Sequence, residues 1–331
     1  MRKRLTLKEY KNGILNKDKS ILSQAITLVE SSLESDFILA SDLVQELLPF
    51  TGNSIRIGIT GVPGVGKSTF IEAFGQLLLK QDKSVAVLAV DPSSQKTKGS
   101  ILGDKTRMEN LSSDKRAFIR PSPTGSALGG VSSKTREAML LCEAAGFDVI
   151  LIETVGVGQS ETAVKGMIDF FLLLMLAGAG DELQGIKKGI MEMADILVIH
   201  KADGENLSQV KKSQSVYKNA LHLFPQDEKK WSAPVVTASS LSGNGLSEIW
   251  QTIEKYFQQM EESEYLEKNR ADQRLKWLEE NLQLLISRYL LGNQEVQNLL
   301  AKNKKKVANG ELSPLVFARD LMNVFFSFKE L

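Results

Sequence analysis

The feature that most restricts the fold of this 331-residue chain is a glycine-rich turn between an apolar run and a helical stretch. The run IRIGIT occupies positions 55–60, and Gly61–Ser68 reads GVPGVGKS, a complete match to GxxxxGK[ST]. The amphipathic stretch STFIEAFGQLLLK follows at positions 68–80. This motif needs a strand before it and a helix after it, because its backbone N–H groups must face phosphate oxygens. The context therefore predicts a P-loop on a parallel sheet.

Short apolar runs separated by helical stretches continue this pattern along the chain. Most of each run is apolar rather than alternating, which is typical of strands buried on both faces. Strands that alternate with helices indicate an α/β fold, here a mainly parallel sheet flanked by helices. The predicted strands are IRIGIT (55–60), VAVLAV (85–90), AFIRP (117–121), DVILIET (148–154), FFLLLML (170–176), ILVIH (196–200) and APVVTAS (233–239).

Helical periodicity marks both flanks of this core. Residues 14–50 place apolar side chains on broad faces, which predicts two or three helices. The helical period returns at Leu246, and the charged stretch EESEYLEKNRADQR (261–274) is expected to precede a further helix. Ser313-Pro314 has the form of an N-cap and a first-turn proline, which predicts a last helix.

Three regions follow from this pattern. We expect an N-terminal helical extension over 1–50, a nucleotide-binding domain over 51–258 and a C-terminal helical arm over 259–331. The arm either packs on its own core or also forms a dimer interface, because it is long and carries aromatic residues. The sequence leaves both interpretations open.

Composition excludes several classes of protein. Lys and Arg total 41 against 40 Asp and Glu, and this net charge of +1 gives no support for nucleic-acid binding. The single cysteine, Cys142, rules out an intrachain disulfide framework and a cysteine-rich metal site. The longest apolar run, FFLLLMLAGAG, is too short for a bilayer, and the first residues lack the apolar stretch of a secretory signal. We therefore expect a cytoplasmic protein with no membrane partner.

The residues of the glycine-rich turn have the chemistry of a nucleoside triphosphate site. Glycines allow the backbone to curl round phosphate oxygens, and the following helix adds its N-terminal dipole. Lys67 would neutralise the β- and γ-phosphates, and the hydroxyl of Ser68 would ligate Mg²⁺. The predicted phosphate-binding residues are Gly61, Val62, Pro63, Gly64, Val65, Gly66, Lys67, Ser68 and Thr69.

Acidic residues end two later strands. Asp91 follows VAVLAV, where it would reach the metal shell or the attacking water, would cap the turn Pro92-Ser93-Ser94, or would do both. Glu153-Thr154-Val155-Gly156 ends DVILIET and occupies the place of the Asp-x-x-Gly element, in which the glycine N–H senses the γ-phosphate. The order of these elements, between a P-loop and a later Lys-x-Asp segment, favours that role for Gly156.

The segment His200-Lys201-Ala202-Asp203 predicts the choice of base. In the Asn-Lys-x-Asp pattern the Asp accepts hydrogen bonds from guanine N1–H and the 2-amino group, whereas adenine would leave that carboxylate unpaired. The stem of Lys201 would cover the base face. Ser239-Ser240-Leu241, after APVVTAS, resembles the SAL-type loop whose backbone approaches the guanine oxygen.

His200 stands where that pattern has Asn. A ring nitrogen of His200 would donate where the Asn amide does, or the side chain has only a local partner at the end of its strand. The sequence leaves both interpretations open. Because Lys201 and Asp203 do most of the discrimination, we expect guanine to remain the preferred base.

Four longer stretches are similar to the MeaB/ArgK-type P-loop GTPases, a metallochaperone class. The similarity runs from about residue 20 to beyond residue 250. The family serves adenosylcobalamin-dependent acyl-CoA mutases, chiefly methylmalonyl-CoA mutase, and some relatives carry an older label as a transport kinase. The stretches are AVDPSSQKTKGSILGDKTRM (89–108), FIRPSPTGSALGGVSSKTREA (118–138), ETVGVGQSE (153–161) and GAGDELQGIKKGIMEMADI (178–196).

The resemblance implies a sheet of the SRP/MinD/BioD type with an N-terminal helical extension and a C-terminal dimerisation arm. It implies GTP and GDP as ligands, a homodimer, and a nucleotide state that gates cobalamin loading of the mutase. Mobile switches would map onto 92–115, 154–165 and 177–190, the last of which would contact the mutase through Asp181, Glu182 and Lys188. The implied Mg²⁺ shell is Ser68, Asp91, Asp104 and Glu153.

Turnover is expected to be slow without a partner. Val157 lies where Ras-like GTPases hold a water-orienting Gln, and valine cannot orient water. The acid best placed for that task is Asp91 or Asp104, and Lys67 and Glu153 complete the predicted catalytic set. No arginine finger is evident in the sequence, although candidate mobile segments contain Arg107, Arg116, Arg120 and Arg136.

Two other functions are alternatives to a GTPase that serves a mutase. A nickel-insertion GTPase would want Cys and His ligands near a switch, and this chain has one Cys and two distant His residues. A small-molecule kinase on a P-loop scaffold would not need the guanine-reading segment around Asp203. Both alternatives are therefore less favoured than a GTPase that serves a mutase.

Overall fold

The computed structural model describes residues 4–90, 108–121, 128–154, 160–178, 188–225 and 228–327. These residues belong to two compact units, Met1–Gln273 and Arg274–Leu331, which are described separately. Among the described residues, none of the helices combines the length and the apolar character that a bilayer span requires.

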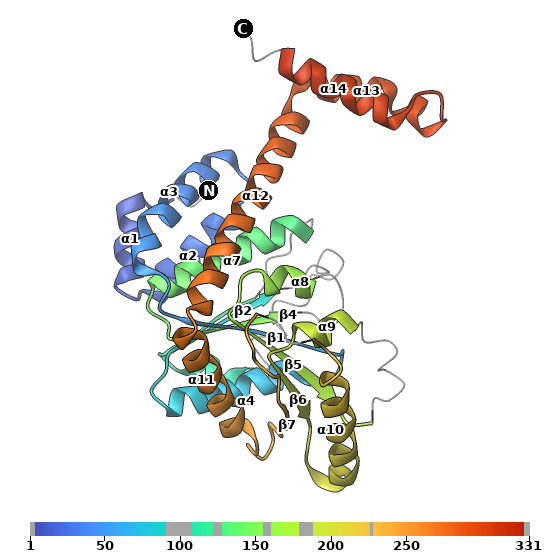
Figure 1. The fold of residues 1–331 in the computed structure, drawn as a ribbon. Coiled ribbons are helices and arrows are strands. Elements are labelled where there is room, and N and C mark those ends of the chain that lie inside the picture. Colours follow the sequence, from blue (N-terminus) through green and yellow to red (C-terminus); the bar gives the residue numbers. More distant parts are fainter. Residues whose placement is uncertain are drawn as a thin grey trace. The chain divides into compact units, whose positions relative to one another are not determined.

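Seven strands of the first unit form one sheet in the order β3-β2-β4-β1-β5-β6-β7 (Figure 1). Each neighbouring pair is parallel. Every predicted apolar run forms a strand at its expected place, so the mainly parallel α/β fold is confirmed. The strands are β1 (Ile55–Gly61), β2 (Val85–Val90), β3 (Ala117–Arg120), β4 (Val149–Thr154), β5 (Phe170–Leu176), β6 (Ile196–His200) and β7 (Val235–Thr237).

Helices cover both faces of this sheet (Figure 1). Helices α7 and α8 pack on one face, and α4 and α11 pack on the other. Helices α1, α2 and α3 pack in turn against α7 and form a further layer on that side. The helices of this unit are α1 (Leu7–Leu15), α2 (Lys19–Val29), α3 (Glu34–Leu47), η1 (Leu48–Phe50), α4 (Lys67–Lys80), α6 (Glu109–Ser113), α7 (Leu128–Ala144), α8 (Ser160–Lys165), α9 (Lys188–Met193), η3 (Gly204–Asn206), α10 (Leu207–Leu221) and α11 (Leu246–Glu262).

The N-terminal extension contains three helices, the upper end of the expected number. The first of them, α1, starts at Leu7 and so lies mostly before the periodic segment 14–50. Thr6 and Glu9 explain this start through a capping box, in which the Thr6 hydroxyl accepts from the Glu9 N–H and the Glu9 carboxylate accepts from the Thr6 N–H at 2.7 Å. Such reciprocal bonds satisfy N–H groups that have no partner within the helix.

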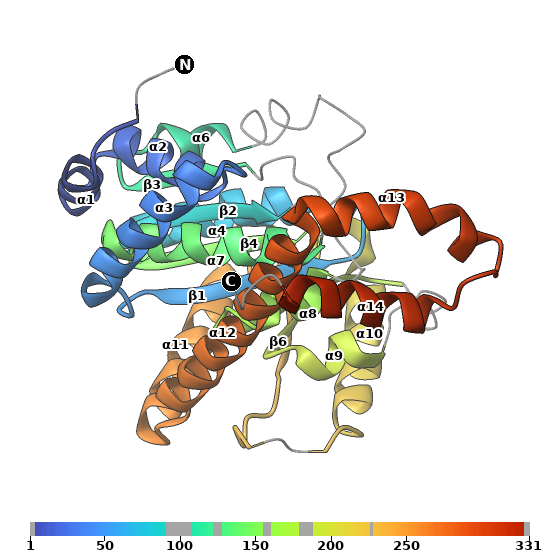
Figure 2. The ribbon, with the colours of Figure 1, turned by 90° about the horizontal axis from the view of Figure 1, so that it is seen from above.

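The second unit has a small core of its own. Helices α13 (Gln294–Ala308) and α14 (Pro314–Ser327) lie side by side (Figure 2). The start of α14 at Pro314 confirms the predicted last helix. The residues buried between the helices of this unit are Val296, Phe317, Leu321 and Phe325.

One expectation about the chain before this unit is wrong. The charged stretch 261–274 was expected to precede a helix, but α12 already starts at Tyr265 and continues to Gly292. Charges of both signs at helical spacing are compatible with an exposed helix, because neighbouring turns can pair them. The high charge content of this stretch therefore gave no indication that α12 starts at Tyr265.

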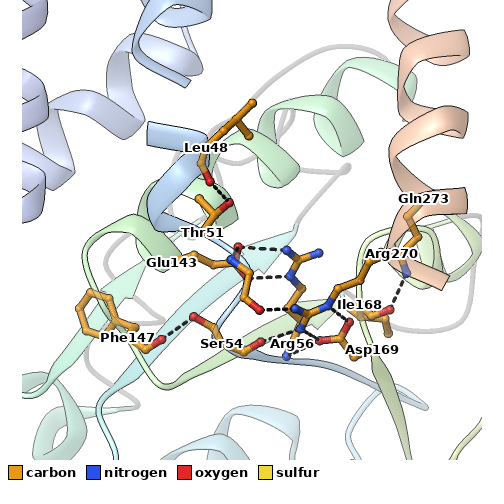
Figure 3. Close-up of polar contacts among 11 residues, drawn as sticks. Leu48, Thr51, Ser54, Arg56, Glu143, Phe147, Ile168, Asp169, Arg270 and Gln273 are labelled. Carbon is orange, nitrogen blue, oxygen red and sulfur yellow. Dashed lines mark hydrogen bonds and ion pairs between the residues drawn. The ribbon is translucent and has the colours of Figure 1, made fainter. Parts of the chain in front are cut away.

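A buried ion network lies where β1 and β5 begin (Figure 3). Nε of Arg56, in β1, donates to Oε1 of Glu143 in α7 at 2.7 Å. Asp169, directly before β5, accepts from the Arg56 backbone N–H at 3.1 Å and from Nε and Nη2 of Arg270 at 2.8 and 2.6 Å. Arg270 lies on α12 and also donates to the Ser54 carbonyl at 2.8 Å. Burial is the largest single influence on the pKa of Arg270 and lowers it, but the hydrogen bonds to Asp169 and the nearby carboxylate charges together raise that pKa.

The network predicts a stability effect. Asp169→Ala is expected to lower the free energy of unfolding by about 3–5 kcal/mol, because Arg270 then stays buried without its carboxylate. Urea denaturation measures this change. The matched control is Lys268→Ala on the same helix, whose pair with Glu228 is exposed and should leave the midpoint unchanged. An Asp169 variant as stable as the wild type would contradict a structural role for the network.

Candidate nucleotide-binding site

The turn Gly61–Ser68 joins β1 to α4 at the carboxyl end of the sheet. Gly64 and Gly66 have φ angles of 77° and 92°, a region in which side chains are strained and glycine is favoured. Gly66 directly precedes α4, so the unpaired N–H groups of the first helical turn adjoin the loop. This local geometry fits phosphate binding at a helix N-terminus.

Side chains engage three carbonyl oxygens of this turn. Carbonyl oxygens repel phosphate, so their engagement by N–H donors favours a loop that offers N–H groups to an anion. Two of the donors, His200 at the end of β6 and Lys201 directly after it, are far away in the sequence. The pairs are Lys67 Nζ to Gly61 O at 3.1 Å, Lys201 Nζ to Gly64 O at 2.9 Å and His200 Nδ1 to Val65 O at 2.7 Å.

Lys67 is the cation nearest the predicted phosphate positions. Its side chain is partly buried, and this burial lowers its pKa, although Glu153 and Glu161 act in the opposite direction. A triphosphate would supply the negative charge that favours the protonated amine. Lys67 is therefore placed as the sequence predicts, at the start of α4.

Ser68 and Glu153 bring two oxygen ligands together. The Ser68 Oγ lies 3.2 Å from Oε1 of Glu153. Strand pairing explains this proximity, because Glu153 of β4 lies beside Ile59 of β1 and Ala89 of β2. Hydroxyl and carboxylate oxygens are ligands that Mg²⁺ accepts, so the residues present fit the ion.

Part of the predicted site cannot be placed. Within the described ranges, no group of three or more His, Cys, Asp or Glu side chains is arranged to hold a metal. The described chain thus shows two of the four ligands that the family resemblance implies. The predicted site residues outside the described ranges are Asp91, Asp104 and Gly156, and the same holds for Arg107, Val157, Asp181 and Glu182.

The loops after β6 and β7 form the second half of the site. The Ala202 N–H donates to the Ala238 carbonyl at 3.0 Å and joins the two loops. Ser239 donates its hydroxyl to the Asp203 carboxylate, which orients that carboxylate. Lys201 has a φ of 57° and turns the chain directly after β6. The Leu241 side chain is 85% exposed, so any role in base binding belongs to its backbone.

Two contacts in this half were not predicted from the sequence. Ser239 was expected to act through its backbone, and nothing in its motif indicated that its hydroxyl would hold Asp203. Asn206 carried no predicted role, but its Nδ2 donates to the Lys201 carbonyl at 2.8 Å and stabilises the turn. An Asn directly before α10 was the available signal, but Asn at that place is also typical of an ordinary helix cap.

His200 connects the two halves. Its ring is 2% exposed, with Nδ1 2.7 Å from the Val65 carbonyl and Nε2 2.6 Å from Oγ of Ser240. These contacts favour the interpretation in which a ring nitrogen donates where the Asn amide would. The phosphate loop and the base-reading loops are therefore held together by one side chain.

The fold is a parallel sheet with a P-loop after β1 and a Lys-x-Asp loop after β6 that contacts the P-loop. This combination defines a P-loop GTPase. The family model described as "Methylmalonyl Co-A mutase-associated GTPase MeaB" matches residues 22–295. The chain belongs to this family, and the resemblance seen in the sequence is confirmed.

Relatives and a solved structure agree with this assignment. The chain is 54% identical over 274 residues to a "Putative GTPase" of Caulobacter vibrioides, covering 83% of this chain and 84% of that protein. It is 45% identical over 316 residues to "GTPase ArgK" of Escherichia coli, covering 96% of each. A crystal structure titled "LAO/AO transport system kinase" matches with a TM-score of 0.75 and 38% identity, over 98% of this chain and 99% of that one. The chain is thus a GTPase that binds guanine nucleotides.

Asp203 provides the test of base reading. Asp203→Asn is expected to weaken GTP binding about 100-fold and to improve XTP binding, because xanthine carries a carbonyl where guanine carries the amino group. Competition against a fluorescent nucleotide measures both affinities. A variant that keeps the wild-type preference for GTP over XTP would contradict the assignment of Asp203.

Proposed function

We propose that this GTPase assists an adenosylcobalamin-dependent acyl-CoA mutase of the methylmalonyl-CoA type, and that its nucleotide state gates cobalamin loading. The observation that carries the proposal is the match of residues 22–295 to a family described as mutase-associated. The described geometry supports a switch, because Glu153 of β4 and the base-reading loops both contact the P-loop segment. A related acyl-CoA mutase is the alternative partner.

The proposed roles of the phosphate half follow from its contacts. Backbone N–H groups of Gly61–Thr69 hold the phosphate oxygens, and Lys67 neutralises the β- and γ-phosphates. The Gly156 N–H senses the γ-phosphate. Bound Mg²⁺ would supply charge neutralisation at the bridging oxygens. The residues that would hold the ion are Ser68, Asp91, Asp104 and Glu153.

The proposed roles of the base half follow from the loops after β6 and β7. Asp203, oriented by the Ser239 hydroxyl, accepts from guanine N1–H and the 2-amino group. The stem of Lys201 lies along one face of the base. The backbone of Ser240 and Leu241 approaches the guanine oxygen.

Hydrolysis in this site needs a water that is correctly oriented. The water attacks the γ-phosphorus, the bond to the β–γ bridging oxygen breaks, and the products are GDP and inorganic phosphate. Val157 cannot orient that water, which leaves Asp91 or Asp104 for the task. We therefore propose slow turnover until a partner completes the site.

The described arginines of the candidate mobile segments support this view. Each already has a partner away from the P-loop, so none stands ready as an arginine finger. A partner would have to supply or reposition such a charge, which is worth about 10³–10⁵ in rate in other GTPases. The pairs are Arg116 with Asp114, Arg120 with Glu30, and Arg136 with the Gly166 carbonyl.

The proposal predicts that a cognate mutase accelerates GTP turnover. Phosphate release is measured with and without methylmalonyl-CoA mutase, and Lys67→Ala serves as the inactive reference. We expect acceleration of at least about tenfold for the wild type, and a smaller effect for Asp181→Ala combined with Lys188→Ala. A mutase that leaves the rate unchanged, and that binds the GTP and GDP forms equally, would refute the switch.

Side-chain burial argues against a nickel-insertion function. Cys142 is fully buried in α7, and this burial raises the pKa of its thiol, which disfavours the thiolate that binds metal. Both ring nitrogens of His200 already have partners. A small-molecule kinase is disfavoured by the base-reading loops and by the GTPase family.

We propose that the arm also makes a homodimer. Within the second unit, α12 carries apolar side chains at heptad spacing, and most of them are exposed. A stripe of this kind fits a second copy of the same helix, because facing helices can bury a and d positions. The stripe consists of Leu275, Leu278, Leu282, Leu285 and Tyr289.

The dimer has a direct test. Leu278→Glu with Leu282→Glu is expected to give a monomer in analytical ultracentrifugation, because both side chains are about half exposed in the single chain and would be buried in the dimer. The matched control is Leu223→Glu, at an exposed position outside the arm, which should remain dimeric. A wild-type monomer would refute the proposal.

A further inference from the structure

The side chain of His200 is buried between two loops that are distant in the sequence. Nδ1 lies 2.7 Å from the carbonyl oxygen of Val65, in the P-loop, and Nε2 lies 2.6 Å from Oγ of Ser240, in the loop after β7. Phe70 of α4 packs edge-to-face against the ring, with centroids 5.7 Å apart. The position of the ring is therefore set by contacts on several sides.

The partners of the ring determine its protonation. The Val65 carbonyl can only accept a hydrogen bond, so Nδ1 must carry a proton. Burial lowers the pKa of His200, with Lys201 acting in the same direction, and this favours the neutral ring. In a neutral ring with Nδ1–H, Nε2 is an acceptor, and the Ser240 hydroxyl must donate to it.

His200 and Ser240 depart together from the patterns that these loops resemble. His200 stands in place of the Asn of Asn-Lys-x-Asp, and Ser240 stands in place of the Ala of the SAL-type loop. The neutral ring with Nδ1–H has an acceptor at Nε2, which the hydroxyl of Ser240 can satisfy and the methyl group of Ala could not. Gly66 provides the space, because a Cβ at that position would lie 3.1 Å from Cε1 of the ring.

We propose that His200 and Ser240 form a paired substitution, in which the two side chains together position the P-loop against the base-reading loop. Both are positioning residues, since neither side chain is required to touch the nucleotide. The inference rests on the proposed guanine site but goes beyond it, because it makes nucleotide affinity depend on the pair rather than on either residue.

The pairing makes the effect of one substitution depend on the other residue. In the wild type, Ser240→Ala leaves Nε2 buried without a donor, and about a tenfold loss of GDP affinity is expected. Beside Asn at position 200, no ring nitrogen is left unpaired. The same Ser240→Ala change is then expected to alter GDP affinity by less than about twofold.

The experiment is a double-mutant cycle on the full chain. GDP affinity is measured by calorimetry for the wild type, S240A, H200N and the double variant H200N/S240A. The matched control is Ser242→Ala in the same loop, whose exposed hydroxyl accepts only from the Asn244 N–H, and which should change affinity by less than about twofold in both backgrounds. Equal effects of S240A in the His and Asn backgrounds would overturn the pairing.

ADP affinity distinguishes failure of the pairing from failure of the guanine site. If the wild type prefers GDP over ADP but the cycle is additive, only the pairing is wrong. If the wild type binds GDP and ADP with equal affinity, the assignment of a guanine site is wrong. The proposed pairing, which rests on that site, is then wrong as well.

Imidazole ¹⁵N spectra separate positioning from a loss of folding. The chain has only two His residues, and exposed His222 provides the reference signal. We expect the Nδ1–H tautomer for His200 in the wild type and a shifted Nε2 signal in S240A, which should still unfold in a single cooperative thermal transition. A His200 ring in the Nε2–H tautomer, or one that is insensitive to S240A, would overturn the proposal.

Discussion

The hydrogen bonding of β1 to both β4 and β5 is the constraint on which the rest of the structure depends. A central parallel strand has its backbone groups satisfied on both edges, so its carboxyl end is held at a defined place. Gly61 ends β1 beside Leu174 of β5, and a Cβ on Gly61 would lie 2.5 Å from the Leu174 carbonyl. The same pairing brings Glu153 beside Ile59 and hence within reach of Ser68. The P-loop therefore begins next to Glu153, which is one of the predicted metal ligands.

The two ends of the strands carry different kinds of polar contact. At the start of β1 and β5, Asp169 and Arg270 hold each other by buried, charge-assisted bonds that any rearrangement would break at high cost. At the carboxyl end, Lys67, Lys201 and His200 hold the P-loop carbonyls, and none of these three contacts pairs two opposite charges. Ligand-dependent change is thus expected in the loops, with the sheet as a fixed base.

Local pattern predicted the strands and the chemistry of the P-loop, because apolar runs and glycine spacing act over a few residues. It failed where local signals conflict. The first helix α1 depends on the Thr6 capping box more than on periodicity, and α12 begins inside the charged stretch 261–274. In the site, the family resemblance implied that Ser68 and Glu153 would lie together, but the hydroxyl contact of Ser239 was not predictable from type or spacing.

The sequence by itself determined the parallel α/β fold and the order of the strands and loops that carry the candidate site. These follow from short-range physics and from motifs whose chemistry needs one particular context. Only the tertiary structure decided what His200 does, because its partners Val65 and Ser240 lie 135 and 40 residues away. It also decided that Arg270, within a charged stretch, is a buried partner of Asp169. Such pairs depend on strand register and helix packing, which no local pattern encodes.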